Sequence, residues 1–138
     1  MVAPTTPLSA TAVSSDDLNS LIGTDACPIL VDVRRRAAFD KAETVIATAR
    51  WHDHASAGTW AADLPVGASV VVYCVHGHAV SQSAAATLRS LGVDAYYLDG
   101  GIDHFIEAGG ITVKRGLVPD GRSSIWVTRE RPKIDRIA

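Results

Sequence analysis

The strongest constraint on the fold is the apolar segment SVVVYC, residues 69–74, which ends at Cys74. A short apolar run of this kind predicts a buried strand. The polar loop VHGHAV follows it, and an amphipathic helix is predicted from near Ser81. The expected buried stripe of that helix consists of Ala84, Ala85, Leu88 and Leu91. Strand, loop and helix in this order place Cys74 at the carboxyl end of a strand, facing a helix amino terminus.

This position favours a reactive thiolate at Cys74. Unpaired backbone N–H groups and the positive end of a helix dipole both stabilise negative charge, and the thiolate is the nucleophilic form of cysteine. The alternative is a buried cysteine that only ends a core strand, because free cysteine packs as a small apolar residue. The loop favours reactivity, since His76 and His78 would cover a core poorly and Gly77 permits a backbone that turns its amides inward.

Strands and helices alternate along the rest of the chain. Strands are predicted at ILVDV (29–33) and DAYYL (94–98), and short helices around 37–41, around 58–63 and from Ile102. Ser14 or Ser15 can cap an earlier helix that has Asp16 and Asp17 in its first turn. The alternation predicts an α/β fold with a mostly parallel sheet, in which ligands bind outside the carboxyl ends of the strands.

Four segments extend this pattern: ILVDVR (29–34), YCVHGH (73–78), AAATLRSLGVDAYYLDGG (84–101) and IDHFIEAG (102–109). In this order they resemble the rhodanese domain, a module that transfers sulfur through a cysteine persulfide. The resemblance covers about residues 13–110. It implies a rhodanese-like α/β fold, with a central, mostly parallel sheet and helices on both faces.

The resemblance also implies roles for individual residues. Cys74 would take a sulfane sulfur from thiosulfate or a protein persulfide, and pass it to cyanide or a thiol. Asp32 and Arg34 match the family's DxR motif, which organises the fold near the site. No cofactor and no metal are implied. The loop whose backbone amides would cradle the sulfur consists of Val75, His76, Gly77, His78, Ala79, Val80 and Ser81.

Three departures from the family pattern leave the substrate open. ETVIATA (43–49) stands where the family usually has GHIPGA, and the basic loop residue of many members is absent at 79 and 80. The span from Cys74 to Gly92 is one residue longer than is usual, and the extra residue fits either the loop or the start of the helix. Phosphatase and arsenate-reductase relatives use a longer loop to admit an oxyanion, but they grip it with an arginine, and Val80 stands here. A phosphatase, an arsenate or chromate reductase, and a non-catalytic sensor or docking module therefore remain as alternatives.

The histidines, two tryptophans and the second cysteine are the remaining candidate residues. The spacings of the four histidines near the predicted site fit no closed metal site. His76 and His78 could donate hydrogen bonds to an anionic sulfur donor, whereas surface positions are predicted for His52, His54 and His104. Trp51 and Trp60 are expected in the core, with the wall of the pocket as the alternative. Cys27 is expected to be structural rather than a resolving partner for Cys74.

Composition is consistent with one domain. The chain has 138 residues, of which 47% are hydrophobic, and two cysteines, too few for a disulfide framework. No apolar run approaches a membrane span, and the first dozen residues lack the charge and apolar core of a secretory signal. We expect no membrane partner, a location in the cytoplasm, and a mobile lead over residues 1–12.

Charge divides the chain near residue 112. Residues 1–112 hold six Lys and Arg against twelve Asp and Glu, whereas residues 113–138 hold seven against three. The basic segment also carries acidic residues and has only Trp126 as an aromatic, so nucleic acid is not the expected partner. WVTRERPKIDRIA (126–138) resembles the opening of the ChrB-type domain of chromate-resistance proteins. We therefore expect a rhodanese-like domain over residues 13–112, followed by a linker and the start of a truncated second domain over residues 113–138.

Overall fold

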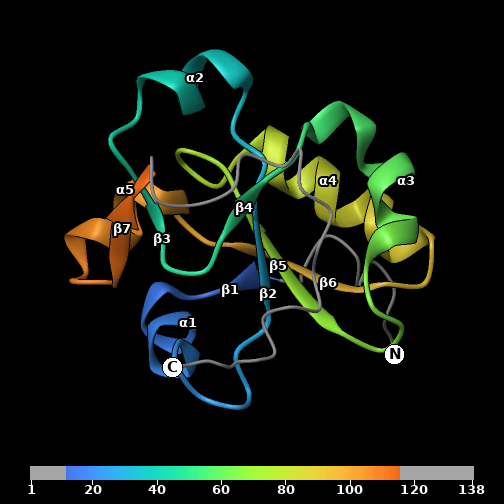
Figure 1. Ribbon diagram of the computed structural model, residues 1–138, viewed down its shortest axis with the longest axis horizontal. Helices are drawn as coiled ribbons and strands as arrows, with labels where there is room; N and C mark the ends of the chain where they lie inside the picture. Colours follow the sequence, from blue (N-terminus) through green and yellow to red (C-terminus); the bar gives the residue numbers. More distant parts are fainter. Residues whose placement is uncertain (1–11, 116–138) are drawn as a thin grey trace, which may run out of the picture.

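The computed structural model describes residues 12–115, which form a five-stranded parallel sheet with helices on both faces. The strand order is β1-β6-β5-β2-β4 (Figure 1). The strands are β1 (Ala12–Val13), β2 (Ile29–Asp32), β4 (Arg50–Trp51), β5 (Ser69–Tyr73) and β6 (Asp94–Leu98). The predicted α/β fold with a mostly parallel central sheet is therefore confirmed.

Helices alternate with these strands along residues 12–115, as predicted. They are α1 (Ser15–Leu21), α2 (Arg36–Lys41), η2 (His54–Ser56), α3 (Ala57–Trp60), η3 (Ala61–Asp63), α4 (Ala79–Ser90) and α5 (Gly101–Glu107). Within residues 12–115, no helix has the length and apolarity that a membrane crossing requires.

Alternating side chains of the central strands build two separate cores. On β5, Val70 and Val72 pack under α3 and α4, whereas Val71 and Tyr73 pack under α1 and α5. Figure 1 shows these two helix pairs on opposite sides of the sheet. Burial on both faces explains why the strand is apolar throughout, instead of alternating apolar with polar residues.

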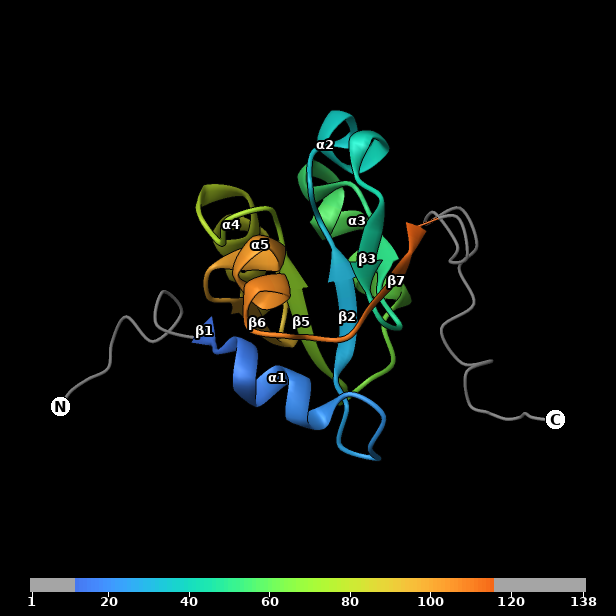
Figure 2. The ribbon, with the colours of Figure 1, turned by 90° about the vertical axis from the view of Figure 1, so that its left-hand side faces the viewer.

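A second, two-stranded antiparallel sheet lies beside the main one. β3 (Thr44–Ile46) pairs with β7 (Thr112–Lys114), as Figure 2 shows. The predicted boundary at residue 112 thus falls inside β7. The predicted linker and second domain from residue 116 onward lie outside the described residues, as do residues 1–11 of the predicted lead. Ala12, the last residue of that lead, lies in β1 and pairs with Tyr97 of β6.

The predicted N-cap of α1 and the predicted buried face of α4 can be compared with the structure. Ser14 caps α1 by accepting a hydrogen bond from Asp17 N at 3.1 Å, as predicted. Ala84, Ala85 and Leu88 of α4 are buried, but Leu91 is 55% exposed, so its assignment to the buried stripe was wrong. The reason is local, because α4 ends at Ser90 and Leu91 lies in its C-cap.

His52 is buried, which corrects the prediction of a surface position. It directly follows β4, and its ring stacks on Trp60 with centroids 5.0 Å apart. Trp60 itself belongs to the core under α3 and α4, as expected. The pattern RWHDHA gave no sign of this burial, because the ring that stacks on His52 belongs to Trp60 of α3, outside that pattern.

We expect His52 to make folding stability depend on pH. Burial, and then the charge of Arg50, lowers the pKa of His52. The unfolded chain therefore binds this proton more tightly, and stability is lost as pH falls below the ordinary histidine value, about 6.5. His52→Phe keeps a ring against Trp60 but does not titrate. In denaturant unfolding at about pH 5 and about pH 7.5, this variant should lose less stability on acidification than wild type does.

His54→Phe provides the matched control, since His54 is only half-buried and lies two residues along the chain. An equal acid sensitivity of wild type and His52→Phe would contradict the role of His52.

Candidate functional site

Cys74 lies at the carboxyl end of β5 with its side chain 6% exposed. Its thiol donates a hydrogen bond to Ser81 Oγ at 3.1 Å. The Ser81 side chain is fully buried, so this hydroxyl is available to the sulfur but not to bulk water. A hydroxyl can rotate to donate instead of accept, so Ser81 can also serve the deprotonated sulfur.

The loop after Cys74 is shorter than predicted. α4 begins at Ala79 and not near Ser81, so the predicted loop residues Ala79, Val80 and Ser81 occupy the first turn of the helix. The first four N–H groups of a helix have no partner within it and carry its positive dipole end. Gly77 has φ +76°, and Gln82 Nε2 donates to its carbonyl at 2.9 Å. The loop is therefore closed onto the helix that follows it.

Helix α5 holds the other side of this loop. Ile102 N donates to Cys74 O at 3.0 Å, and Asp103 N donates to Val75 O at 3.1 Å. Gly101, in the motif LDGGI, has φ +65°, and a Cβ there would collide with the backbone of Cys74 and Val75. The glycine is thus required for the close approach of helix and loop, and this motif has a structural function.

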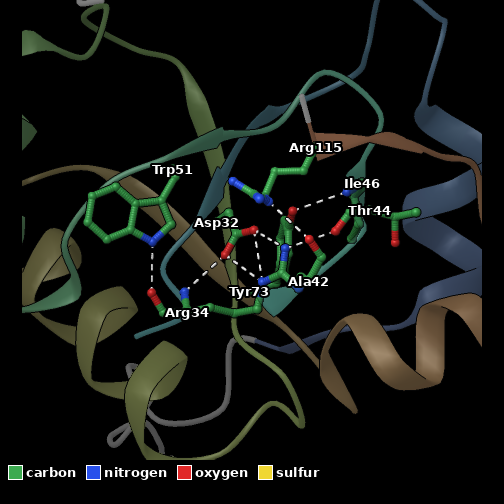
Figure 3. A network of polar contacts seen from close by, with 8 residues as sticks. All are labelled: Asp32, Arg34, Ala42, Thr44, Ile46, Trp51, Tyr73 and Arg115. Carbon is green, nitrogen blue, oxygen red and sulfur yellow. Dashed lines mark hydrogen bonds and ion pairs between the residues drawn. The ribbon is translucent and has the colours of Figure 1, made fainter. Parts of the chain in front are cut away.

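Asp32 and Arg34 form a buried ion pair beneath the site, shown in Figure 3. Arg34 Nε lies 3.0 Å from both carboxylate oxygens, and its Nη2 donates to Asp32 Oδ2 at 2.5 Å and to Thr44 O at 3.0 Å. Burial opposes the charged form of Arg34, but the hydrogen bond and charge of Asp32 outweigh it and raise the pKa of Arg34. Burial, and then the charge of Asp32, raises the pKa of Tyr73 well above its ordinary value.

The two loop histidines lie at the surface. His76 Nδ1 is 3.4 Å from Asp103 Oδ2 of α5, and both side chains are more than half exposed. The His76 and His78 rings are 6.2 Å apart. His104 is exposed, as predicted, and its Nδ1 is 3.9 Å from Glu107 Oε1. Among the described residues, no three His, Cys, Asp or Glu side chains gather as a metal site would require.

A cavity of about 290 Å³ opens above Cys74. It is lined by Arg34, Arg35, Ala38, Cys74, Val75, His76, His78, Ala79 and Val80. The structure therefore brings together most of the predicted loop residues with Arg34, while Asp32 and Ser81 lie behind the wall. Among the lining residues of this cavity there is no tryptophan, because Trp60 is in the core and Trp51 donates its Nε1–H to Arg34 O at 2.8 Å.

Sequence reasoning missed Arg35 and Ala38. A signal was present, because β2 and β5 are parallel neighbours with Asp32 beside Tyr73. Residues that follow the two strands therefore share one edge of the sheet, and RRRAA follows β2 there.

Cys27 lies at the amino-terminal end of the parallel strands, opposite to Cys74. It precedes β2, whereas Cys74 follows β5, and the two strands run parallel. Strands of this length separate the two ends by roughly 15 Å, which is too far for a disulfide without rearrangement. Neither cysteine forms a disulfide, and the Cys27 thiol donates to Pro28 O at 3.4 Å.

Solved structures with the same architecture include several bacterial and archaeal proteins. A full-length protein from Lactobacillus plantarum aligns with TM-score 0.69 and 19% identity, over 76% of this chain and 88% of its own. A rhodanese-related protein from Thermoplasma volcanium gives 0.61 and 27%, over 75% and 97%. A protein of unknown function from Rhodopseudomonas palustris, described as a possible tyrosine phosphatase, gives 0.63 and 20%, over 80% and 97%.

Family comparison agrees with this architecture. Curated proteins compared with the chain give no match. Residues 14–108, the part of the chain that carries the sheet, Cys74 and α5, match the rhodanese-like domain. This match covers most of the chain, so the chain belongs to the rhodanese-like domain family.

Proposed function

We propose that this protein is a sulfurtransferase in which Cys74 carries sulfane sulfur as a persulfide. The observation that carries the proposal is the position of Cys74 Sγ. Cys74 lines a cavity at the carboxyl end of β5, its Sγ lies 3.1 Å from a buried hydroxyl, and the loop 75–78 leads from it to the first turn of α4. Membership of the rhodanese-like family, which includes sulfurtransferases, supports it.

The reaction would consist of two displacements at sulfur. The Cys74 thiolate attacks the outer sulfur of thiosulfate, the S–S bond of the donor breaks, and sulfite leaves with the electron pair. The product at Cys74 is a persulfide anion. An acceptor such as cyanide or a thiolate then attacks the terminal sulfur and releases the Cys74 thiolate. The first-turn amides of α4 and the Ser81 hydroxyl would stabilise the anion in both steps.

A phosphatase is the second candidate. The long span from Cys74 to Gly92 and the Rhodopseudomonas palustris neighbour, described as a possible tyrosine phosphatase, favour it. Residues 75–81 contain no arginine or lysine, and Arg34 is held by Asp32. The cysteine loop itself therefore lacks the bidentate grip on a tetrahedral dianion that such enzymes use, since Arg35 lines the cavity from the β2–α2 loop, and for this reason we rank it below sulfur transfer.

Partners and location remain predictions. Thiosulfate or a persulfide is the proposed donor, a thiol or cyanide the acceptor, and the cytoplasm the location. The proposed link to chromate resistance rests on residues 126–138, which lie outside the described residues, and the comparisons do not test it. A non-catalytic sensor module is the remaining alternative, and loss of persulfide chemistry in the purified chain would favour it.

Cys74→Ser should abolish transfer of sulfur from thiosulfate to cyanide while the fold is retained. Serine fits beside Ser81 but cannot form a persulfide. Mass spectrometry of wild type should show the addition of one sulfur after thiosulfate treatment and its loss after cyanide. Cys27→Ser is the matched control and should keep full activity, because Cys27 lies at the far edge of the sheet. Activity lost in Cys27→Ser but kept in Cys74→Ser would refute the assignment.

Hydrolysis of an aryl phosphate by wild type should be negligible. The physical reason is that no side chain of the cysteine loop, residues 75–81, offers two parallel donors to the phosphate. Rates for p-nitrophenyl phosphate and for thiosulfate, measured at matched concentrations, decide the ranking. A phosphatase rate above the sulfurtransferase rate would make the second candidate the better one.

His76→Asn and His78→Asn should each raise the KM for thiosulfate mainly at low pH, with kcat affected less. A protonated imidazole attracts the anionic donor, which a neutral amide does not. One such hydrogen bond is worth about 1 kcal/mol, or roughly fivefold in KM. Kinetics between about pH 5.5 and about pH 8 test this. If both variants match wild type throughout, the loop histidines take no part in holding the donor.

A further inference from the structure

Arg35 places a guanidinium at the rim of the Cys74 cavity. It is exposed, it follows Arg34 in the loop after β2, and it lines the cavity together with Ala38 of α2. Within residues 12–115, its side chain has no hydrogen bond, ion pair or ring contact with another residue. It occupies the N-cap position of α2 but makes no side-chain cap. The side chain is therefore not engaged in holding the fold.

The other cationic groups of the cavity are already matched by carboxylates or depend on pH. Arg34 is held by Asp32, and His76 faces Asp103 at 3.4 Å. His78 is a histidine and therefore not a permanent cation. Arg35 thus supplies the permanent positive charge of the cavity. It comes from the β2–α2 loop, whereas the basic residue of many family members belongs to the cysteine loop.

The remaining wall is apolar and encloses more space than an inorganic ion needs. Ala38 and Val80 bring side chains from α2 and α4, and Val75 and Ala79 complete this surface. A volume of about 290 Å³ lies near the lower end of the range of about 300–1,000 Å³ typical of sites for small organic molecules. Methylene groups lose unfavourable contact with water against such a wall, whereas thiosulfate oxygens would lose hydration there.

We propose that Arg35 is the recognition residue for the sulfur donor, and that the donor is a small organic persulfide bearing a carboxylate. The carboxylate pairs with the Arg35 guanidinium, whose forked donors match its geometry and whose single charge matches its own. The carbon stem lies against Ala38 and Val80, which leaves the sulfane sulfur above Cys74. This inference rests on the proposed sulfurtransferase function and names its donor class.

The transfer step balances without an oxidant. The Cys74 thiolate attacks the outer sulfur of R–S–SH, and a new S–S bond forms at Cys74. The S–S bond of the donor breaks, and R–S⁻ leaves with the electron pair. The sulfane sulfur keeps its proton during the step, so the charge on both sides is the same. Cys74 thereby becomes Cys–S–SH, and the released thiolate carries the carboxylate away from Arg35.

Two donors of similar length, one with a carboxylate and one without, show whether Arg35 recognises the carboxylate or is needed for sulfur transfer itself. The persulfide of 3-mercaptopropionate carries a carboxylate, and the persulfide of 2-mercaptoethanol carries a hydroxyl in its place. Loading of Cys74 is followed by mass spectrometry under single turnover, for wild type, Arg35→Ala and Arg35→Lys. We expect Arg35→Ala to raise the half-saturating concentration of the carboxylate donor about fivefold or more, and to leave the hydroxyl donor unchanged. Arg35→Lys should restore part of the loss.

Arg36→Ala is the matched control. Arg36 neighbours Arg35, is similarly charged, and pairs with Asp40 at 3.1 Å outside the cavity. It should load both donors as wild type does. Equal effects of Arg35→Ala and Arg36→Ala, or equal effects of Arg35→Ala on both donors, would overturn the role of Arg35. A wild-type preference for thiosulfate over the carboxylate donor would overturn the donor class. If no donor loads wild-type Cys74, the proposed function itself fails.

Discussion

The buried ion pair between Asp32 and Arg34 is the interaction on which the site depends. Asp32 is the last residue of β2, and Arg34 Nη2 reaches across to the carbonyl of Thr44 in β3. The guanidinium lies 5.8 Å from the centre of the Tyr73 ring, whose hydroxyl accepts from Ile46 N at 3.1 Å. Loss of one partner of a buried pair typically costs about 3–5 kcal/mol, because the other charge is left uncompensated. The pair thus joins β2, β3 and β5 directly beneath the cavity.

This arrangement also fixes the direction in which the chain leaves the sheet. Asp32 Oδ1 accepts from Arg34 N at 3.0 Å, and Trp51 Nε1 donates to Arg34 O at 2.8 Å (Figure 3). The backbone after β2 is therefore held on both sides before Arg35 begins the next turn. A motif that performs no chemistry can in this way determine which side chain reaches the cavity.

Much of the fold could be predicted because the signals are local. Four apolar residues before Cys74 and a polar loop after it are enough to indicate a strand, a turn and a helix. β1 and β4 have only two residues each, too few for a pattern, and their place depends on pairing with β6 and β2. The burial of His52 and the presence of Arg35 at the cavity depend on how the chain folds back over the sheet. His52 stacks on Trp60 of α3, and Arg35 meets residues of the cysteine loop, so both placements follow from tertiary packing; only the shared carboxyl ends of β2 and β5 offered a signal for Arg35.

Because α5 packs closely against the cysteine loop, one part of the domain fixes the geometry around the sulfur and another part selects the incoming molecule. Because Gly101 brings the amides of Ile102 and Asp103 onto the carbonyls of Cys74 and Val75, the loop backbone is held in place from within the protein. Little conformational entropy remains to be lost there when a molecule enters. Side chains at the rim, on the β2–α2 loop, form no part of that packing. Substitutions in the β2–α2 loop can therefore change which molecule the cavity prefers. They leave the geometry around the Cys74 sulfur unchanged.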